Sequence, residues 1–217
     1  MKREVRSGNP DATEPVPLRF APLTADTWPD LEHLFGERGG CGGCWCMSWR
    51  LPRAEFERQK GAANKAALRR IVVKGPPPGI LAWYGSEPVG WCAVAPRQSY
   101  VRLAKSRVLR PVDNQPVWSI SCLFVRKEFR RRGVSVRLLQ AAAELAAAHG
   151  ATIVEGYPVT PYTPNAPAAF LWTGTMASFE AAGFVEVQRG SPSRPIFRRS
   201  VVSGTRGDSR VFAGPGE

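Results

Sequence analysis

The spacing of hydrophobic positions changes within one stretch of the chain, residues 117–150. Residues 117–125 read Val-Trp-Ser-Ile-Ser-Cys-Leu-Phe-Val, which has the length and the β-branched and aromatic content of a buried strand. From Gly133 onward the apolar residues recur at helical spacing, and Gly150 follows the last of them. A basic segment, residues 126–132, lies between. The stretch therefore predicts a strand, a tight basic turn and an amphipathic helix.

Strands and helices also alternate in the rest of the chain, by the same criteria of period and turn residues. The predicted strands are residues 16–21, 79–84, 88–95, 152–158, 185–187 and 196–202. The predicted helices are residues 28–35, 52–71 (an uneven one), 100–104 and 173–184. The strand at 152–158 follows the helix at 134–149 and is expected to lie parallel to 117–125, through a right-handed crossover. This order predicts an α/β fold.

Length and composition fit one domain with a sizeable core, since 43% of the 217 residues are hydrophobic. We assign residues 16–202 to this domain and expect flexible tails at 1–15 and, Gly-rich, at 203–217. No apolar run approaches the length of a membrane span, and no secretory signal is visible. We therefore expect a cytoplasmic protein without a membrane partner.

The net charge of +12 has two interpretations, a nucleic-acid surface or a site for a small polyanionic ligand. The densest basic cluster, residues 126–137, coincides with the predicted start of a helix. The first N–H groups of a helix lack intrahelical partners and attract anions. Gly133 would let a ligand approach the backbone closely. These features favour a phosphate or pyrophosphate site.

Three cysteines, Cys41, Cys44 and Cys46, fall within six residues of a Gly- and Trp-rich segment. Such spacing is typical of zinc ligands, but no fourth ligand lies near and no second Cys-x-x-Cys pair is present. The alternative is a strand or extended loop, with Cys44 and Cys46 facing one way and Trp45 and Trp49 the other. We favour the alternative and assign no metal.

The segment Arg-Arg-Arg-Gly-Val-Ser at residues 130–135 resembles the (Gln/Arg)-x-x-Gly-x-(Gly/Ala) acyl-CoA signature of the GCN5-related N-acetyltransferases. Its place between a buried strand and an amphipathic helix matches the context of that signature. Ser135 departs from the last position, although serine is also small. The resemblance implies a mixed central sheet with two splayed parallel strands, flanked by helices, and acetyl-CoA as cosubstrate. The segment Gly-Cys-Gly-Gly-Cys-Trp-Cys-Met at 40–47 further resembles a bacterial subgroup of the family, without indicating a substrate.

The resemblance also implies positions for the ligands. The pantetheine arm would lie along the strand at Leu123, Phe124 and Val125. The pyrophosphate would be held by Arg130, Arg131, Arg132, Gly133, Val134 and Ser135. The acceptor site would include Trp45 and Trp49.

The acid and base of acetyl transfer are harder to place. Many family members have a Glu on the central strand and a Tyr in the late helix, where this chain has Ser119 and Phe179. We keep Phe179 as a cofactor contact. The remaining catalytic candidates are Glu155 and Tyr157, which alternate onto one face of a strand, and Tyr162 in the loop beyond. An ion pair with an arginine is the structural alternative for Glu155.

The sequence thus predicts an N-acetyltransferase that moves an acetyl group from acetyl-CoA to an amine of a small molecule or peptide. The alternatives are a basic nucleic-acid-binding module, which lacks a recognisable reading helix, and a non-catalytic CoA-binding sensor. A homodimer is compatible with the sequence, but no exposed stripe requires one.

Overall fold

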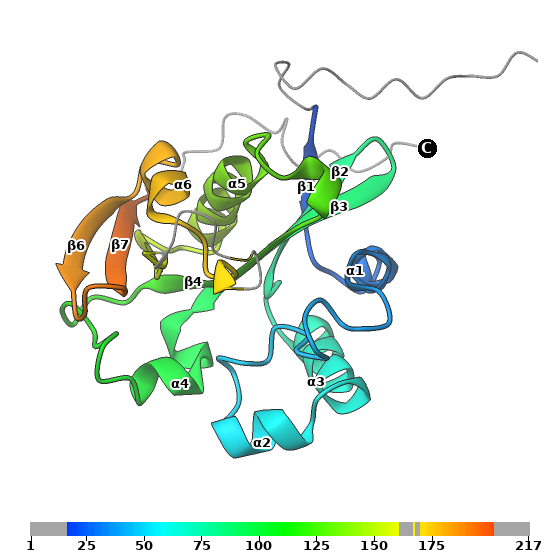
Figure 1. Cartoon of the computed structure of the whole chain (residues 1–217), viewed down its shortest axis with the longest axis horizontal. Helices are drawn as coiled ribbons and strands as arrows, with labels where there is room; N and C mark the ends of the chain where they lie inside the picture. The colour runs from blue at the N-terminus through cyan, green and yellow to red at the C-terminus, as the bar shows by residue number, and fades with distance from the viewer. Residues whose placement is uncertain (1–16, 161–166, 168–169, 202–217) are drawn as a thin grey trace, which may run out of the picture.

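The computed structural model describes residues 17–160, 167 and 170–201, which form a seven-stranded sheet with helices on both faces (Figure 1). The strands are β1 (Arg19–Pro22), β2 (Gly79–Tyr84), β3 (Glu87–Pro96), β4 (Trp118–Val125), β5 (Ile153–Gly156), β6 (Val185–Arg189) and β7 (Pro195–Ser200). The helices are α1 (Trp28–Phe35), α2 (Arg53–Arg58), α3 (Ala62–Lys74), α4 (Val101–Ala104), α5 (Val134–Ala148) and α6 (Met176–Ala181). Two short 3₁₀ turns, η1 (Arg97–Ser99) and η2 (Lys127–Phe129), complete the described elements.

The sheet is mixed, with the strand order β1-β2-β3-β4-β5-β7-β6. The pair β4 and β5 is parallel, and the other neighbours are antiparallel. Helix α5 makes the crossover from β4 to β5. The predicted α/β fold and its parallel central pair are confirmed.

The two parallel strands separate halfway along β4. Their pairing ends where Ile120 lies opposite Gly156, and β4 continues to Val125 without a strand beside it on that side. At the same point the register between β3 and β4 shifts, so that Ser121 has no partner on β3. Such an extra residue bends a strand and increases its twist. The sheet therefore has an open edge along residues 121–125, as the splayed strands of the family led us to expect.

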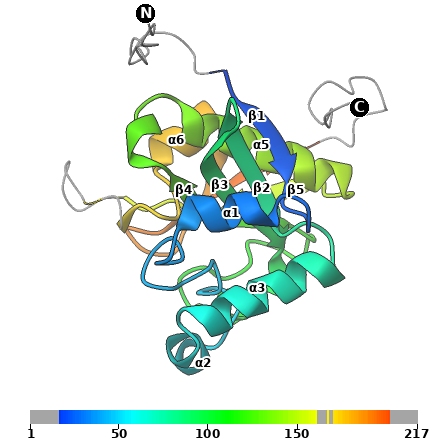
Figure 2. The same cartoon turned by 90° about the vertical axis from the view of Figure 1, so that its right-hand side faces the viewer.

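Two hydrophobic layers enclose the sheet. Helix α5 lies on one face, where Leu138, Leu139 and Leu145 pack among buried side chains of β2–β5. On the other face lie α1 and α3, which pack around Trp83 and Trp91 (Figure 2). Helix α5 ends before Gly150, whose φ of 82° is easily adopted by glycine.

Three sequence predictions need correction. The helix expected over 52–71 is two helices, α2 and α3, because the chain turns at Gly61 with φ of 87°. The segment 39–50 is not extended: Trp45 and Cys46 have φ of 42° and 53°, so their side chains do not alternate as in a strand. Helix α6 begins at Met176 rather than at 173, because Thr175 caps it and accepts a hydrogen bond from the Ser178 N–H.

The predicted tails at 1–15 and 203–217 lie outside the described residues, as does Tyr162. Within the part of the chain that is described, no helix is both long and apolar enough to cross a bilayer.

Candidate functional site

A cavity of about 960 Å³ lies beside the unpaired edge of β4. It is bounded by residues 40–49 of the cysteine segment, by the turn before α5, and by residues 171–178 leading into α6. Its volume is that of pockets that hold drug-sized ligands or cofactors. Most of the features predicted from the sequence can be placed relative to this cavity.

The turn before α5 forms one end of the cavity. Arg130, Arg131, Gly133, Val134 and Ser135 all line it. Gly133 precedes the helix in the left-handed conformation, with φ of 73°, and no side chain caps the first N–H groups. A Cβ built on Gly133 would meet no other atom within 4 Å, so the approach to these N–H groups is open. The turn thus combines helix N–H donors with two guanidinium groups, the arrangement that binds phosphate.

The side chains of the basic turn differ in their contacts. The Nε of Arg130 donates to the backbone oxygen of Val125 at 3.0 Å, which ties the turn to the end of β4. Arg132 is outside the cavity lining, and its guanidinium lies 5.8 Å from the centre of the Phe129 ring. Arg130 and Arg131 therefore stay candidates for phosphate contact, whereas the position of Arg132 does not support that role.

The backbone of β4 offers fewer free donors than the sequence suggested. The N–H of Leu123 donates to the backbone oxygen of Trp172 at 2.7 Å, and the N–H of Arg126 donates to Val89 in β3. Because successive N–H groups of a strand point to opposite edges, the N–H of Phe124 faces β3 and that of Val125 faces the open edge. The family resemblance implies a backbone N–H of Leu123 or Phe124 as the donor to the thioester carbonyl. Here the Leu123 N–H is already bonded and the Phe124 N–H faces β3, which leaves Val125 as the donor toward the open edge. Leu123, Phe124 and Val125 all line the cavity, and their contact with a pantetheine arm stays a prediction.

The cysteine segment forms the opposite end. Trp49 lines the cavity and packs against Trp172, with ring centroids 5.9 Å apart. Trp45 does not line it: its ring is 4% exposed and stacks on Trp28 at 6.1 Å. The left-handed turn at Trp45 directs this side chain into the core, so only Trp49 remains an acceptor-site candidate.

Four cysteines, Cys41, Cys44, Cys46 and Cys122, line the cavity, although the sequence analysis gave Cys122 no role. Its place in the central strand beside Leu123 is the signal that could have drawn attention to it. Burial raises the pKa of Cys44 to about 11. The pKa of Cys46 is raised well above its ordinary value by the hydrogen bond with Cys122 and by burial. Both thiols are therefore protonated near neutral pH. Among the described residues, no three Cys, His, Asp or Glu side chains are placed so that they could hold a metal ion.

The strand residues predicted to be catalytic lie in a buried network instead. Glu155 is fully buried and accepts hydrogen bonds from Arg97 Nη1 at 2.5 Å, Arg198 Nε at 2.8 Å and the Tyr157 hydroxyl at 2.6 Å. Tyr157 also contacts Ser119, with 2.8 Å between the two hydroxyl oxygens. Burial, followed by the charge of Glu155, raises the pKa of Tyr157 well above its ordinary value. Neither Glu155 nor Tyr157 lines the cavity.

This network fits the structural alternative for Glu155, an ion pair with arginine. Arg198 continues it to Asp113, whose carboxylate lies 2.7 Å from Nη1. The guanidinium of Arg198 holds the pKa of Asp113 below its usual value. Sequence alternation had placed Glu155 and Tyr157 on one face correctly, but the arginines come from the distant segments η1 and β7, and no local pattern pointed to them.

Phe179 is also in the core rather than in the cavity. It is fully buried against Phe184 and Phe197. A Cβ built on Gly156, the last residue of β5, would come within 2.1 Å of the Phe179 ring. Phe179 thus occupies the space where β4 and β5 begin to separate, and its predicted contact with a cofactor is corrected to a packing role.

The chain also matches a known protein family. A model of the acetyltransferase (GNAT) family matches residues 45–172, more than half of the chain. The chain belongs to that family. The match runs from the cysteine segment through β4 and α5 to Trp172, and so includes most of the residues around the cavity of this GNAT protein.

The chain is also similar to solved structures, one of them with a TM-score above 0.5. A GNAT-family acetyltransferase from Streptococcus agalactiae is 10% identical, with 85% of this chain and 95% of that one covered and a TM-score of 0.51. The PaiA N-acetyltransferase from Thermoplasma acidophilum, solved with coenzyme A, is 12% identical over 85% and 99%, with a TM-score of 0.49. An acetyltransferase from Thermus thermophilus is 21% identical over 86% and 99%, with a TM-score of 0.46. A search of curated proteins found no match.

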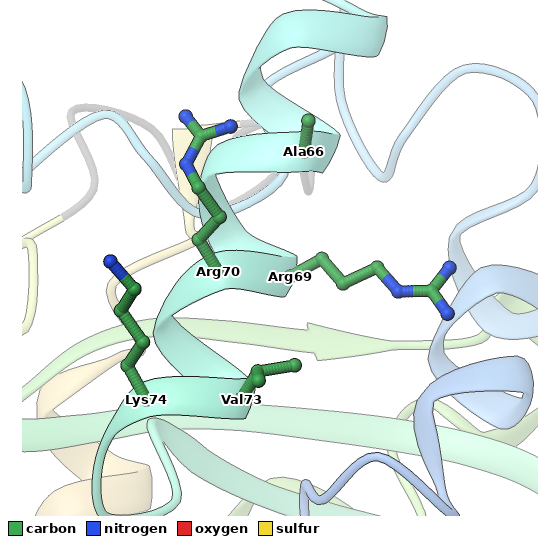
Figure 3. Close-up of a pocket in the computed structure, with 5 residues that line it drawn as sticks. All are labelled: Ala66, Arg69, Arg70, Val73 and Lys74. Atoms are coloured by element: carbon green, nitrogen blue, oxygen red, sulfur yellow. The ribbon is translucent and has the colours of Figure 1, made fainter.

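A second, smaller hollow of about 320 Å³ lies on α3, outside the region of the GNAT cavity. It is lined by Ala66, Arg69, Arg70, Val73 and Lys74. Arg69 extends to one side of the helix, and Arg70 and Lys74 extend to the other (Figure 3). The guanidinium of Arg69 lies 5.7 Å from the centre of the Trp28 ring. These cations do not converge on one point, so we assign no ligand to this hollow.

Proposed function

We propose that this GNAT protein is an N-acetyltransferase that uses acetyl-CoA and acetylates an amine of a small molecule or peptide. One observation carries the proposal: the open phosphate-binding turn of α5 and the unpaired edge of β4 line the same cavity. A ligand with a pyrophosphate at one end and an amide-containing arm could engage both. The finer resemblance of residues 40–47 to a bacterial subgroup remains a prediction.

The residues around the cavity fit such a ligand. The N–H groups at the start of α5, together with Arg130 and Arg131, would hold the pyrophosphate. The Val125 N–H, on the open edge of β4, would bind an amide oxygen of the arm or the thioester oxygen. A backbone donor directed at that oxygen stabilises the charge that develops on it during acyl transfer. Acetyl-CoA, when bound, supplies the acyl group.

The protein supplies few groups for proton transfer. Among the described residues, no Asp, Glu, His or Tyr lines the cavity. The internal residues outside the description, 161–166 and 168–169, contain no Asp, Glu or His either, although Tyr162 is among them. We infer that the amine reaches the site uncharged or releases its proton to water. The protein's part is to position the two substrates and to polarise the carbonyl.

The same observation favours a second candidate, a CoA-binding sensor without catalysis. Both candidates require cofactor binding, and only the enzyme releases free thiol in the presence of an amine. A titration and a turnover assay therefore separate them.

The test is calorimetric titration of acetyl-CoA into the wild type and two variants, Gly133→Glu and Gly150→Glu. Both glycines have positive φ, of 73° and 82°, and open surroundings, and they lie at opposite ends of α5. The two variants therefore introduce the same backbone strain and the same charge. We expect binding to be lost only in Gly133→Glu, where the carboxylate occupies the phosphate site. Equal affinity in both variants, or no binding by the wild type, would overturn the proposal.

A further inference from the structure

Two of the cysteines around the cavity are separated in sequence by only two glycines. Cys41 and Cys44 line the acceptor end of the cavity, which is the end that contains Trp49. Cys41 is exposed to solvent, and Cys44 is partly buried. The acetyl transfer proposed above uses neither thiol. Cys-x-x-Cys motifs with an accessible cysteine are typical of sites of disulfide exchange.

The backbone places the two cysteines opposite each other across a tight turn. The Cys44 N–H donates to the backbone oxygen of Cys41 at 3.1 Å, and Gly42 and Gly43 between them have φ of 55° and 73°. A four-residue turn closed by such a hydrogen bond brings its outer Cα atoms within about 7 Å of each other. Cα atoms joined by a disulfide are usually about 4.4–6.8 Å apart. A disulfide between Cys41 and Cys44 therefore requires little movement of the backbone.

The turn is held in place by hydrogen bonds to its second glycine, Gly43. The backbone oxygen of Gly43 accepts from the Gly61 N–H at 3.0 Å and from Asn64 Nδ2 at 3.3 Å, at the start of α3. The Gly43 N–H donates to the backbone oxygen of Arg38 at 2.7 Å. None of these bonds involves a cysteine, so they can persist when the two thiols are joined. Because the turn is already ordered, closing a disulfide across it costs little conformational entropy.

The other thiols of the cavity are less available to a reagent. Cys46 is 6% exposed, and its Sγ accepts a hydrogen bond from Trp91 Nε1 at 3.1 Å. Cys122 is partly buried and interacts with Cys46. Burial raises the pKa of Cys44 to about 11, which makes its thiolate scarce. Cys41 is therefore the thiol that a reagent from solvent meets first.

We propose that Cys41 and Cys44 are a dithiol that reduces low-molecular-weight disulfides, such as glutathione disulfide, by thiol–disulfide exchange. The Cys41 thiolate attacks one sulfur of the small disulfide, whose S–S bond breaks, and keeps that half as a mixed disulfide. Cys44 then gives its proton to water and attacks Sγ of Cys41, which releases the second half. Each released thiolate takes up a proton. The two cysteines lose two electrons and two protons, and the small disulfide becomes two thiols.

The experiment incubates the reduced protein with excess glutathione disulfide and follows its mass. We expect the wild type to lose two hydrogen atoms and to keep no glutathione. Fragmentation of the tryptic peptide 39–50 should then place the disulfide between Cys41 and Cys44. Cys44→Ser should keep one glutathione on Cys41, which a reductant removes. Cys41→Ser should react at least about tenfold more slowly, because the remaining thiol of the turn is rarely ionised.

Cys46→Ser and Cys122→Ser are the matched controls. They make the same chemical change at thiols that also line the cavity but lie outside the turn, and both should be oxidised as the wild type is. A disulfide that involves Cys46 or Cys122, a stable glutathione adduct on the wild type, or no reaction would overturn the inference. Mapping the wild-type disulfide needs no variant, so a variant that fails to fold does not prevent the test. None of these readouts depends on acetyl-CoA, so the exchange and the proposed acetyl transfer can fail separately.

Discussion

The buried carboxylate of Glu155 either stabilises the fold or takes part in the reaction, and a substitution can separate these two roles. In Glu155→Gln the side chain keeps its shape but loses the charge shared by Arg97 and Arg198, which lie 2.5 and 2.8 Å away. The new amide also brings N–H donors into contact with groups that already donate. Removing one partner of a buried ion pair destabilises a protein by about 3–5 kcal/mol. We expect a loss of this size in the free energy of unfolding.

Thermal unfolding measures this loss. For a chain of this length, 1 kcal/mol shifts Tm by about 2–4 °C, so Glu155→Gln should lower Tm by about 6–20 °C. The matched control is Glu144→Gln, at an exposed position on α5, where the same chemical change should alter stability by less than about 0.5 kcal/mol.

Turnover distinguishes the structural role from a catalytic one. Below its Tm, Glu155→Gln should bind acetyl-CoA and release thiol as the wild type does, because Glu155 does not line the cavity. A variant with wild-type stability and strongly reduced turnover would refute this reasoning and restore Glu155 as the catalytic candidate that the sequence indicated.

Three further predictions follow from packing and protonation. Gly156→Ala places a methyl group 2.1 Å from the Phe179 ring and should lower the free energy of unfolding by about 1–3 kcal/mol. Gly75→Ala, where the nearest contact of the new methyl group is 3.7 Å, should lower it less. Equal Tm values for the two variants would contradict this packing. Iodoacetamide at pH 8 should label exposed Cys41 first. Because the pKa of Cys44 is raised to about 11, its thiolate is about 100-fold scarcer at pH 8 than that of an ordinary thiol. The labelling of Cys44 should therefore accelerate about tenfold per pH unit. Equal labelling rates for Cys41 and Cys44 would be inconsistent with the burial of Cys44. Finally, kcat/KM should rise with pH up to the pKa of the acceptor amine and shift with that pKa between acceptors, whereas an inflection at one fixed pH would indicate a base on the protein.

The sequence predicted the centre of the fold well. The strand at β4, the helix α5 and the parallel return at β5 follow from a change of hydrophobic period and from turn residues, which are local properties of the chain. The hairpin of β2 and β3 follows from similar signals. Where a prediction failed, one or two residues had an unusual backbone conformation, as at Gly61 and at Trp45 and Cys46. Hydrophobic period contains no information about such φ angles.

The candidate site was predictable only in part. Arg130, Arg131 and Gly133 were found because the motif and the helix start coincide in sequence. The partners of Glu155 could not be predicted in this way, since Arg97 and Arg198 come from distant segments that the fold brings together. Likewise, the Trp172 carbonyl that accepts the hydrogen bond from the Leu123 N–H lies 49 residues away in the chain, too far for any local sequence pattern to indicate it.

Ser121, which has no partner on β3, divides β4 into two parts with different neighbours. Before it, Ser119 belongs to the ionic network of β5 and β7; after it, residues 122–125 face the cavity. A mutation at the acceptor end therefore leaves the buried ion pairs intact. In evolutionary terms, the residues around the cavity can change while the packing and the ion pairs of the sheet are conserved.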